Sequence, residues 1–462
     1  MAECAGPSKD GLGPSVSDCE DDDISEDISD WEDDVDQIKE MRFQFAIQWL
    51  YKIMQSENDV VSCPFSLHDG LLRIYLTVYD DSKELLKRII FKSSYFKHWI
   101  KPKIENYTSY RHRFAQLIRE NEDEDFSYSM DQCFCWTSFR VKRSRNKKRR
   151  RNRNSKVSRY FNNTKKFELF DIMHNAGRNE IERITHINKY MKVYTTSFMS
   201  EPLVFLNRRK SPELVLTNIF RYTQKFEKVS TASSLSVASS MPSLAAHIYQ
   251  RKRIGFFSKK LAIHVSEFPC LRDEGDGTSL YVVLPATLVS DTWTIKQNIT
   301  KDDIFNLVLR LLEPNGVVVL QELLHGVKAL EGDDTGIETW PTFKVETNVE
   351  IPNLLEFLDK EELFVPGAID LWKDRTRNAK NEHKLNLVHR VRVDITGNHT
   401  NLCAINSICT EEGIEQKPNI FEVNNDYPFV WFIYDKEFRE IFFIGVFQNP
   451  KKSDPEMFEK IV

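Results

Sequence analysis

Glycine and proline are scarce in this chain, with 16 and 17 residues among 462. This excludes a collagen-like protein and a low-complexity linker, which need far more of both. Hydrophobic residues make up 41% and aromatic residues 12% of the chain, including 31 Phe. The chain therefore has enough apolar side chains for a large buried core, which excludes a fully disordered or fibrous protein.

Cysteine is also sparse, with eight residues, too few for a scaffold that disulfides hold together. Cys133 and Cys135 have one residue between them, and no Cys or His pair follows at zinc-finger spacing. We therefore expect free thiols, no metal site and no cofactor.

Long apolar runs are missing too. No stretch reaches the roughly 18 apolar residues that cross a bilayer. Residues Met1–Ser8 lack the basic start and apolar core of a secretion signal. The sequence predicts an intracellular protein, in the cytoplasm, the nucleus or both, with no membrane partner.

The net charge of −5 hides two opposite blocks. Residues 18–40 hold 13 acidic residues and one Lys, whereas residues 141–159 hold 11 basic residues and no acid. An acidic segment with so few apolar groups cannot form a core. We predict a disordered acidic tail over residues 1–36 and a folded part over 37–462, which opens with an amphipathic helix over Gln37–Ser56.

The basic block is dense enough to predict a protruding loop inserted at 141–159. Nuclear import, binding of nucleic acid or another polyanion through residues 142–153, and a merely solvated loop all remain open. No aromatic residue interrupts the block, so base stacking is not implied. Its densest part contains Lys142, Arg143, Arg145, Lys147, Lys148, Arg149, Arg150 and Arg151.

Apolar residues recur at helical spacing early in the chain, for example over Leu71–Leu76 and Arg178–Tyr194. A buried strand is predicted over Leu214–Phe220, and short strands dominate after residue 246. The predicted late strands are Leu280–Leu284, Val317–Leu320, Thr342–Val345, Val391–Ile395, Phe429–Ile433 and Ile441–Phe447. Without a regular alternation of strand and helix, this order indicates one large α+β domain with helices on a large central mixed sheet and further sheets.

Seven segments resemble motifs of the serpin (serine protease inhibitor) family, and they occur in the family's order between Gln37 and Pro450. In chain order they are Ser62–Leu67, Leu214–Asn218, Tyr281–Pro285, Trp340–Val345 with Leu354–Leu358, His389–Thr400, Pro428–Ile433 and Gly445–Pro450. The chain is identified by this resemblance as a divergent member of the serpin superfamily.

The resemblance implies a serine-type endopeptidase inhibitor or regulator that is not itself an enzyme. In serpins an exposed reactive loop near the C-terminus is cleaved by a serine or cysteine protease and inserts as a strand into the central sheet. By this resemblance the loop spans about residues 397–420. The alternative is a non-inhibitory serpin-fold protein that binds partners through its basic loop.

A polar cluster beneath the central strands governs sheet opening in the family. The resemblance assigns this role here to Cys63, Ser66, Asn218 and His389. It also implies a hydrogen bond between His389 and Asn218. Cys63 occupies a position where the family has Ser, which suggests altered opening.

The hinge of the loop departs from the family pattern. Its residues are His399, Thr400, Leu402, Ala404 and Asn406, of which the last four would face the core after insertion. Thr400 and Ala404 are small, but Leu402 is bulky and Asn406 needs polar partners. His399, where the family has Gly, removes backbone freedom. These departures predict slow insertion and a poor covalent trap for proteases.

Two positions for the cleaved bond remain open. Counting forward from Thr400 gives Gly413–Ile414, whereas counting back from Pro428 gives Lys417–Pro418. The acidic surroundings offer no Arg to a trypsin-like protease, and no target protease follows from the sequence.

Overall fold

The structure is a computed structural model of the chain. It describes residues 26–57, 59–77, 128–137, 168–171, 214–225, 250–252, 254–269, 277–325, 337–339, 342–352, 354–358, 369–370, 382–396, 399–409, 419–423 and 427–448, with short pieces at 86–87, 90, 188–189, 191–192, 195 and 198–199.

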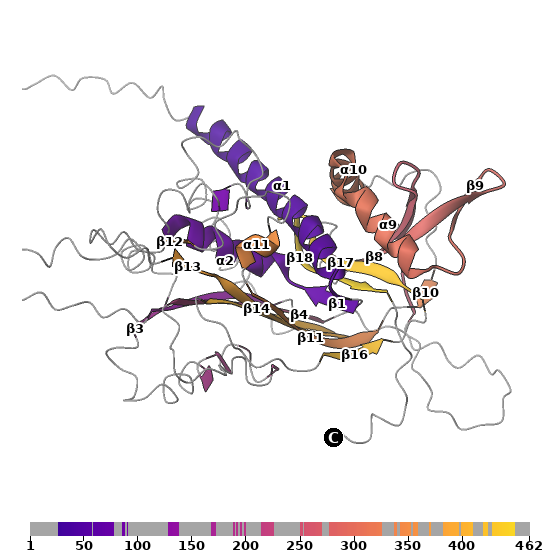
Figure 1. The fold of residues 1–462 in the computed structure, drawn as a ribbon. Coiled ribbons are helices and arrows are strands. Elements are labelled where there is room, and N and C mark those ends of the chain that lie inside the picture. The colour runs from indigo at the N-terminus through magenta and orange to yellow at the C-terminus, as the bar shows by residue number, and fades with distance from the viewer. Residues whose placement is uncertain are drawn as a thin grey trace, which may run out of the picture.

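Two large sheets form the body of the molecule (Figure 1). The central sheet has seven strands, in the order β16 (Ile420–Val423), β11 (Phe343–Ile351), β14 (Asn386–Ile395), β15 (His399–Cys409), β4 (Leu214–Lys225), β2 (Tyr128–Thr137) and β3 (Glu168–Asp171). Neighbouring strands are antiparallel except β2 and β3, which are parallel. The predicted α+β class with a mixed central sheet is confirmed.

The second sheet also has seven strands. Its order is β1 (Asp59–Ser62), β18 (Glu440–Phe447), β17 (Phe429–Asp435), β8 (Thr278–Val289), β7 (Ile263–Pro269) and β6 (Ile254–Ser258), with β9 (Thr292–Ile295) paired to β8. Two small sheets pair β10 (Ile337–Thr339) with β5 (Gln250–Lys252), and β12 (Ile369–Asp370) with β13 (Glu382–His383).

Among the described residues, four long helices and one short helix lie on one side of the central sheet, beside the second sheet (Figure 1). They are α1 (Glu26–Met54), α2 (Pro64–Thr77), α9 (Lys301–Leu312), α10 (Pro314–His325) and the short α11 (Leu354–Leu358). Thr300 caps α9, because its hydroxyl accepts from the Asp303 amide while the Asp303 carboxylate accepts from the Thr300 amide. None of the helices that the structure describes is long and apolar enough to cross a membrane.

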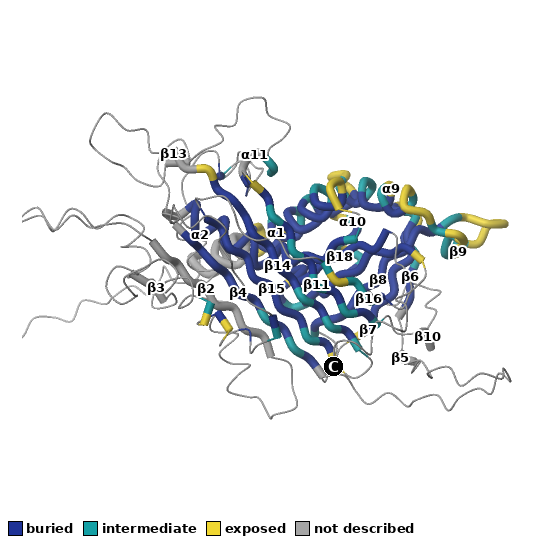
Figure 2. Tube along the Cα trace, turned by 60° about the horizontal axis from the view of Figure 1, so that its bottom comes forward, coloured by how far each residue is buried: buried dark blue, intermediate teal, exposed yellow. Residues whose placement is uncertain are grey.

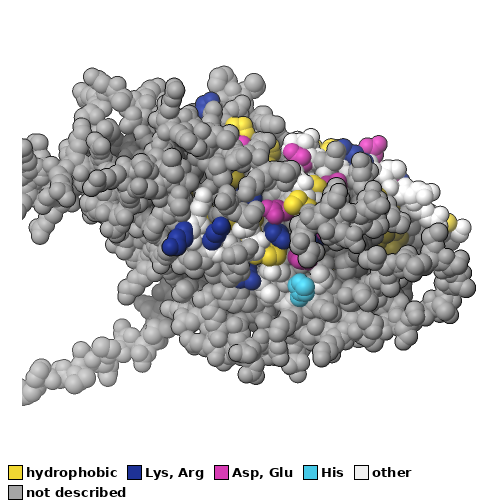
Figure 3. Space-filling model, turned by 90° about the horizontal axis from the view of Figure 1, so that it is seen from below, with side chains coloured by type: hydrophobic (Ala, Val, Ile, Leu, Met, Phe, Trp, Pro, Cys, Tyr) yellow, Lys and Arg dark blue, Asp and Glu magenta, His cyan; other side chains and the backbone are white. Residues whose placement is uncertain are grey.

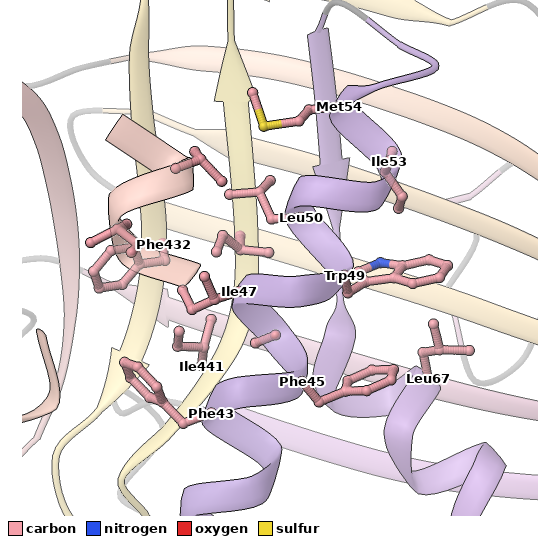
Figure 4. Close-up of a cluster of buried hydrophobic side chains, with 14 of the residues drawn as sticks. Phe43, Phe45, Ile47, Trp49, Leu50, Ile53, Met54, Leu67, Phe432 and Ile441 are labelled. Carbon is pink, nitrogen blue, oxygen red and sulfur yellow. The ribbon is translucent and has the colours of Figure 1, made fainter. Parts of the chain in front are cut away.

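Two apolar clusters make up the core. In the first, α1 turns one face toward β17 and β18, where Phe43 and Ile47 lie close to Phe432 and Ile441 (Figure 4). This face arises because apolar residues recur every three or four positions along α1. The second cluster joins the two sheets. Core residues from strands far apart in sequence thereby hold both sheets in one unit.

Helix α1 begins earlier than the sequence predicted. The folded part was expected from residue 37, but α1 starts at Glu26. Acidic residues favour the first turns of a helix, where they interact with the positive end of the helix dipole. The same composition that argued against a core therefore does not prevent a helix over residues 26–36.

The predicted strand over Val317–Leu320 is wrong, because these residues lie inside α10. A short apolar run cannot be assigned to strand or helix from hydrophobicity alone. Pro314 supplies a backbone angle suited to the first turn of a helix. Val317 and Leu320 are buried whereas Val318 is exposed, which is helical spacing rather than alternation.

Candidate functional site

The segment predicted to be the hinge of an exposed loop is a central strand in this structure. β15 pairs with β14 on one side and with β4 on the other, along its whole length (Figure 2). All its residues except His399 and Asn401 are buried. The exposed loop predicted from about residue 397 is therefore already inserted as far as Cys409, because both neighbouring strands offer backbone partners to it.

The inward side chains of β15 fit the space between the sheets. Thr400, Leu402 and Ala404 are each 0% exposed, and Asn406 is 1% exposed. Leu402 and Ala404 belong to the apolar cluster that joins the two sheets. The bulk of Leu402, expected to hinder insertion, is accommodated in the inserted strand.

The turn between β14 and β15 is closed by polar contacts. The amide of Thr396 donates to the carbonyl of His399 at 3.0 Å, and the amide of His399 donates back to the Thr396 hydroxyl at 3.2 Å. The same hydroxyl lies 3.0 Å from His399 Nδ1. His399 therefore stabilises the hairpin that insertion forms.

His389 lies at the centre of a buried polar cluster. Its Nε2 accepts from the amide of Cys63 at 3.2 Å and lies 2.8 Å from Ser62 Oγ. Its Nδ1 contacts Asn406 Oδ1. Because Asn406 Oδ1 can only accept, Nδ1 carries the proton and the ring is neutral. Trp49 Nε1 donates to Ser62 Oγ at 2.6 Å, which orients that hydroxyl.

Burial lowers the pKa of His389 to about 4, against an opposing effect of its hydrogen bond with Asn406. A neutral ring suits the geometry, because Nε2 must accept from the Cys63 amide. Protonation would place a second donor against that amide. The cluster is therefore intact at neutral pH and is disturbed in acid.

Asn218 lies on the other side of the inserted strand. Its Nδ2 donates to the carbonyl of Ser66 at 3.0 Å, and it packs close to Gly70 of α2. Asn406 is opposite both His389 on β14 and Asn218 on β4. The predicted hydrogen bond between His389 and Asn218 is therefore absent, because Asn406 separates them and takes the contact with His389.

Three polar groups of this cluster have no hydrogen-bond partner among the described residues. They are the Ser66 hydroxyl, Asn406 Nδ2, which is a donor, and Asn218 Oδ1, which is an acceptor. Asn406 and Asn218 lie opposite each other in β15 and β4.

Sequence reasoning missed several residues of the site. Ser62 and Trp49 were taken only as part of a motif and of a helix face, yet they carry the contacts of His389. A buried ionic group was also missed, in which Arg42 Nε lies 3.2 Å from Glu440 Oε1 and Arg73 donates to Asp69. The spacing of Asp69 and Arg73, four residues apart on one helix, was the signal available.

Several predicted site residues lie outside the described residues. They are the candidate scissile residues Gly413, Ile414 and Lys417, and the basic residues Lys142, Arg143, Arg145, Lys147, Lys148, Arg149, Arg150 and Arg151. Within the described ranges, no group of three or more His, Cys, Asp or Glu is placed to hold a metal ion.

The sequence matches a family model described as Serpin (serine protease inhibitor) over residues 42–450. It is 21% identical to an uncharacterised serpin-like protein of Thermococcus kodakarensis over 412 residues, which are 87% of this chain and 83% of that protein.

The fold is similar to that of a cleaved, loop-inserted ovalbumin mutant, with a TM-score of 0.60 and 13% identity over 88% of this chain and 98% of that one. It is also similar to the thermophilic serpin tengpin in its latent state, with a TM-score of 0.57 and 12% identity over 90% of this chain and 98% of that one.

Proposed function

Because the chain belongs to the serpin family, we propose that it is a serine-type endopeptidase inhibitor, not an enzyme, that acts by cleavage of its reactive loop and insertion of β15. The observation that supports this most is the in-register pairing of all eleven residues of β15 with β4. Two solved structures with a similar fold, the ovalbumin mutant and tengpin, are likewise in a loop-inserted and a latent state.

The inserted strand supplies the driving force that such a mechanism requires. Insertion buries Leu402 and gives Asn406 a hydrogen-bonding partner in His389. Both side chains are larger than those usual in the family, and both contacts stabilise the inserted form. Insertion also converts exposed backbone groups into sheet hydrogen bonds on both sides. A protease bound covalently to the cleaved loop would be displaced and distorted by this step.

The stability of the inserted form does not determine how fast β15 inserts. That the chain is a poor covalent trap for proteases therefore stays a prediction. Trapping requires that insertion outrun hydrolysis of the acyl-enzyme, and a barrier raised by about 1.4 kcal/mol slows insertion tenfold. His399 lacks the backbone freedom of the Gly that the family has there, and Ile405 is stiff because it is branched at Cβ. We therefore propose an inhibitor that loses a large share of encounters to simple cleavage.

The test is a panel of serine and cysteine proteases, each incubated with the intact chain and separated on denaturing gels. We expect at least one protease to give a stable high-mass complex together with a larger amount of chain cleaved between residues 410 and 418. A chain with Thr400→Arg, which places a charge at a buried inward position, is the control and should give cleavage without complex. Cleavage by many proteases with no complex from any of them would contradict inhibition.

A second candidate function is that of a non-inhibitory serpin-fold binding protein. It is favoured by the presence of β15 in the sheet of a chain that is not cleaved, because a chain that has inserted its loop cannot trap a protease. In this case the basic residues at 142–153 would bind an import factor or a polyanion. Binding to heparin that weakens steeply with salt, together with accumulation in the nucleus, would support this candidate.

A further inference from the structure

Two arginines lie on either side of the inserted strand at the same level. Arg392 of β14 is opposite Cys403 of β15, and Cys403 is opposite Arg221 of β4. Burial raises the pKa of the Cys403 thiol to about 12, and both arginines act on it in the opposite direction, as positive charges next to a thiol do. The inserted strand is thus flanked by positive charge at position 403.

Without β15, the two arginines would be neighbours. β14 and β4 are both antiparallel to β15, so they run parallel to each other and would pair directly if β15 were absent. All pairs of β14 and β4 residues that share a β15 partner, including His389 with Asn218 and Arg392 with Arg221, have the same offset in sequence number. The register that brings His389 beside Asn218 therefore also brings Arg392 beside Arg221, at about 4.8 Å between strands instead of about twice that distance.

Among the sheet residues that the structure describes, few acidic groups on this side could compensate for the two charges. Glu346 of β11 lies 3.6 Å from Arg392 Nη1 and 3.2 Å from Arg390 Nη2, so one carboxylate serves two arginines. If β14 and β4 paired directly, Asp394 would lie opposite Thr223 and therefore diagonal to Arg221. Arg390 would lie on the other diagonal, and its positive charge would offset the negative charge of Asp394. Figure 3 shows this side of the molecule, with basic and acidic side chains both visible among the described residues.

Arg221 itself is poorly compensated. Its Nε is buried and has no hydrogen-bond partner among the described residues. On β2, the residue opposite Arg221 is Met130, and the residues two positions before and after it are Tyr128 and Gln132. None of these three residues carries a charge. Arg221 therefore adds a positive charge beside Arg392 that neighbouring strands do not neutralise.

We infer that Arg221 and Arg392 are positioning residues that favour strand insertion, because they repel each other across the sheet without β15 and are separated when β15 enters. The inference rests on the proposed function only in assuming that a form of the chain without inserted β15 exists. Like charges directly opposite each other in a sheet are destabilising. The pair therefore raises the free energy of that form more than that of the inserted form, in which β15 doubles the separation between the two strands.

The experiment follows insertion in the intact chain without any protease. The protein is refolded by dilution, and the rate at which the amides of His399–Cys409 become protected from hydrogen exchange is measured by mass spectrometry. We expect Arg221→Gln and Arg392→Gln each to slow protection about two- to fivefold, the factor that corresponds to one like-charge pair. Arg221→Glu, which turns repulsion into attraction, should slow it more, whereas Arg221→Lys should insert at the wild-type rate.

Salt gives an independent readout that a purely structural role would not change. Raising the ionic strength from about 0.01 M to about 1 M shortens the Debye length from about 30 Å to about 3 Å. It should slow insertion of the wild-type chain by a similar factor and leave Arg221→Gln unaffected. Lys344→Gln is the matched control, because Lys344 lies on the same side of the sheet and keeps its β14 neighbour in both forms.

The double variant tests whether Arg221 and Arg392 act on each other. The double variant Arg221→Gln with Arg392→Gln should be no slower than either single variant, because either change removes the repulsion. Effects that add independently, effects no larger than that of Lys344→Gln, or complete protection at the first time point in every variant would each overturn the inference. Failure to form a protease complex would count against the proposed function and leave this result standing.

Discussion

At the scale of single residues, the contact between His389 and Asn406 has the clearest consequence. The sequence predicted that Asn406 would disfavour insertion, because a buried amide without hydrogen-bond partners lowers stability by about 1–3 kcal/mol. In the structure it meets the neutral ring of His389, which is itself held by Ser62 and Cys63. Asn406 of the inserting strand thus finds a hydrogen-bond donor in His389, which belongs to the neighbouring strand β14.

Asn406→Ala should lower the free energy of unfolding of the inserted form by about 1–3 kcal/mol, because His389 Nδ1 would lose its acceptor in a buried site. Asn401→Ala on the same strand is the matched control. The side chain of Asn401 accepts from Thr223 at 3.2 Å but is only half-buried, so its loss should cost less than about 1 kcal/mol. Denaturant unfolding measures both, and equal losses would contradict the role of Asn406.

The titration of His389 predicts a pH dependence. Its pKa is about 4 in the folded chain and about 6.5 in the unfolded chain, so only the unfolded chain takes up the proton between these values. The contribution of His389 to stability is therefore full above pH about 6.5 and falls by about 3 kcal/mol as the pH drops to about 4.

Glu440 acts in the opposite direction. Burial raises its pKa to about 7, partly offset by Arg42, so stability falls as the pH rises from about 4.5 to about 7. The wild-type chain should therefore show a shallow profile. Glu440→Gln should expose the loss of stability in acid that His389 causes, and His389→Gln should expose the opposite slope. Denaturant unfolding from about pH 4 to about pH 8 measures the free energy of unfolding of each variant over the interval in which both groups titrate. If the two variants depended on pH in the same way, these assignments would be contradicted.

At the scale of elements, β15 decides how the candidate site is understood. An alternating strand pattern correctly indicates which residues of 399–409 face inward, because side chains alternate along any strand. That pattern does not say whether the inward space accepts a Leu. The second sheet and β4 supply that space, and Leu402 is fully buried in it.

Leu402→Ala should therefore destabilise the inserted form by about 2–5 kcal/mol, the usual cost of a cavity at a buried Leu. Leu288→Ala in β8 is the control, because Leu288 is 54% exposed and its truncation should change stability by less than about 0.5 kcal/mol. Thermal unfolding measures both variants. A Leu402→Ala chain as stable as the wild type or more stable would show that Leu402 is overpacked, as the sequence suggested.

At the scale of the whole molecule, the two sheets and the inserted strand form one cooperative unit. α1, β17 and β18 build one apolar cluster, and residues of β4, β14 and β15 build the other with β17 and β18. A strand that enters this unit stabilises residues far from the loop. Global stability is therefore the natural measure of whether β15 is inserted.

A freshly refolded chain whose β15 has not yet entered the sheet should melt at a lower temperature than the same chain after nicking between residues 410 and 418, because nicking lets β15 reach the fully paired position that the structure shows. A ΔΔG of about 1 kcal/mol moves the melting temperature of a large domain by roughly 2–4 °C, so full insertion should be readily detected by calorimetry. Equal melting temperatures before and after nicking would mean that the intact chain is inserted from the start, and would favour the non-inhibitory candidate.

The fold class and the family could be predicted from the sequence, because the described parts of the seven motifs lie mostly in buried strands and helices whose apolar patterns are local. The resemblance pointed to Asn218 and His389 as members of a polar cluster, and their role in sheet opening stays a prediction. Strand alternation predicted the inward positions of residues 400–406. The sequence could not place β15 between β14 and β4, because that depends on pairing with residues far away in the sequence, such as Asn218 opposite Asn406. Only the tertiary structure decided that Asn406 separates His389 from Asn218 and that Cys403 separates Arg392 from Arg221. These contacts follow from sheet register, which many distant residues set together.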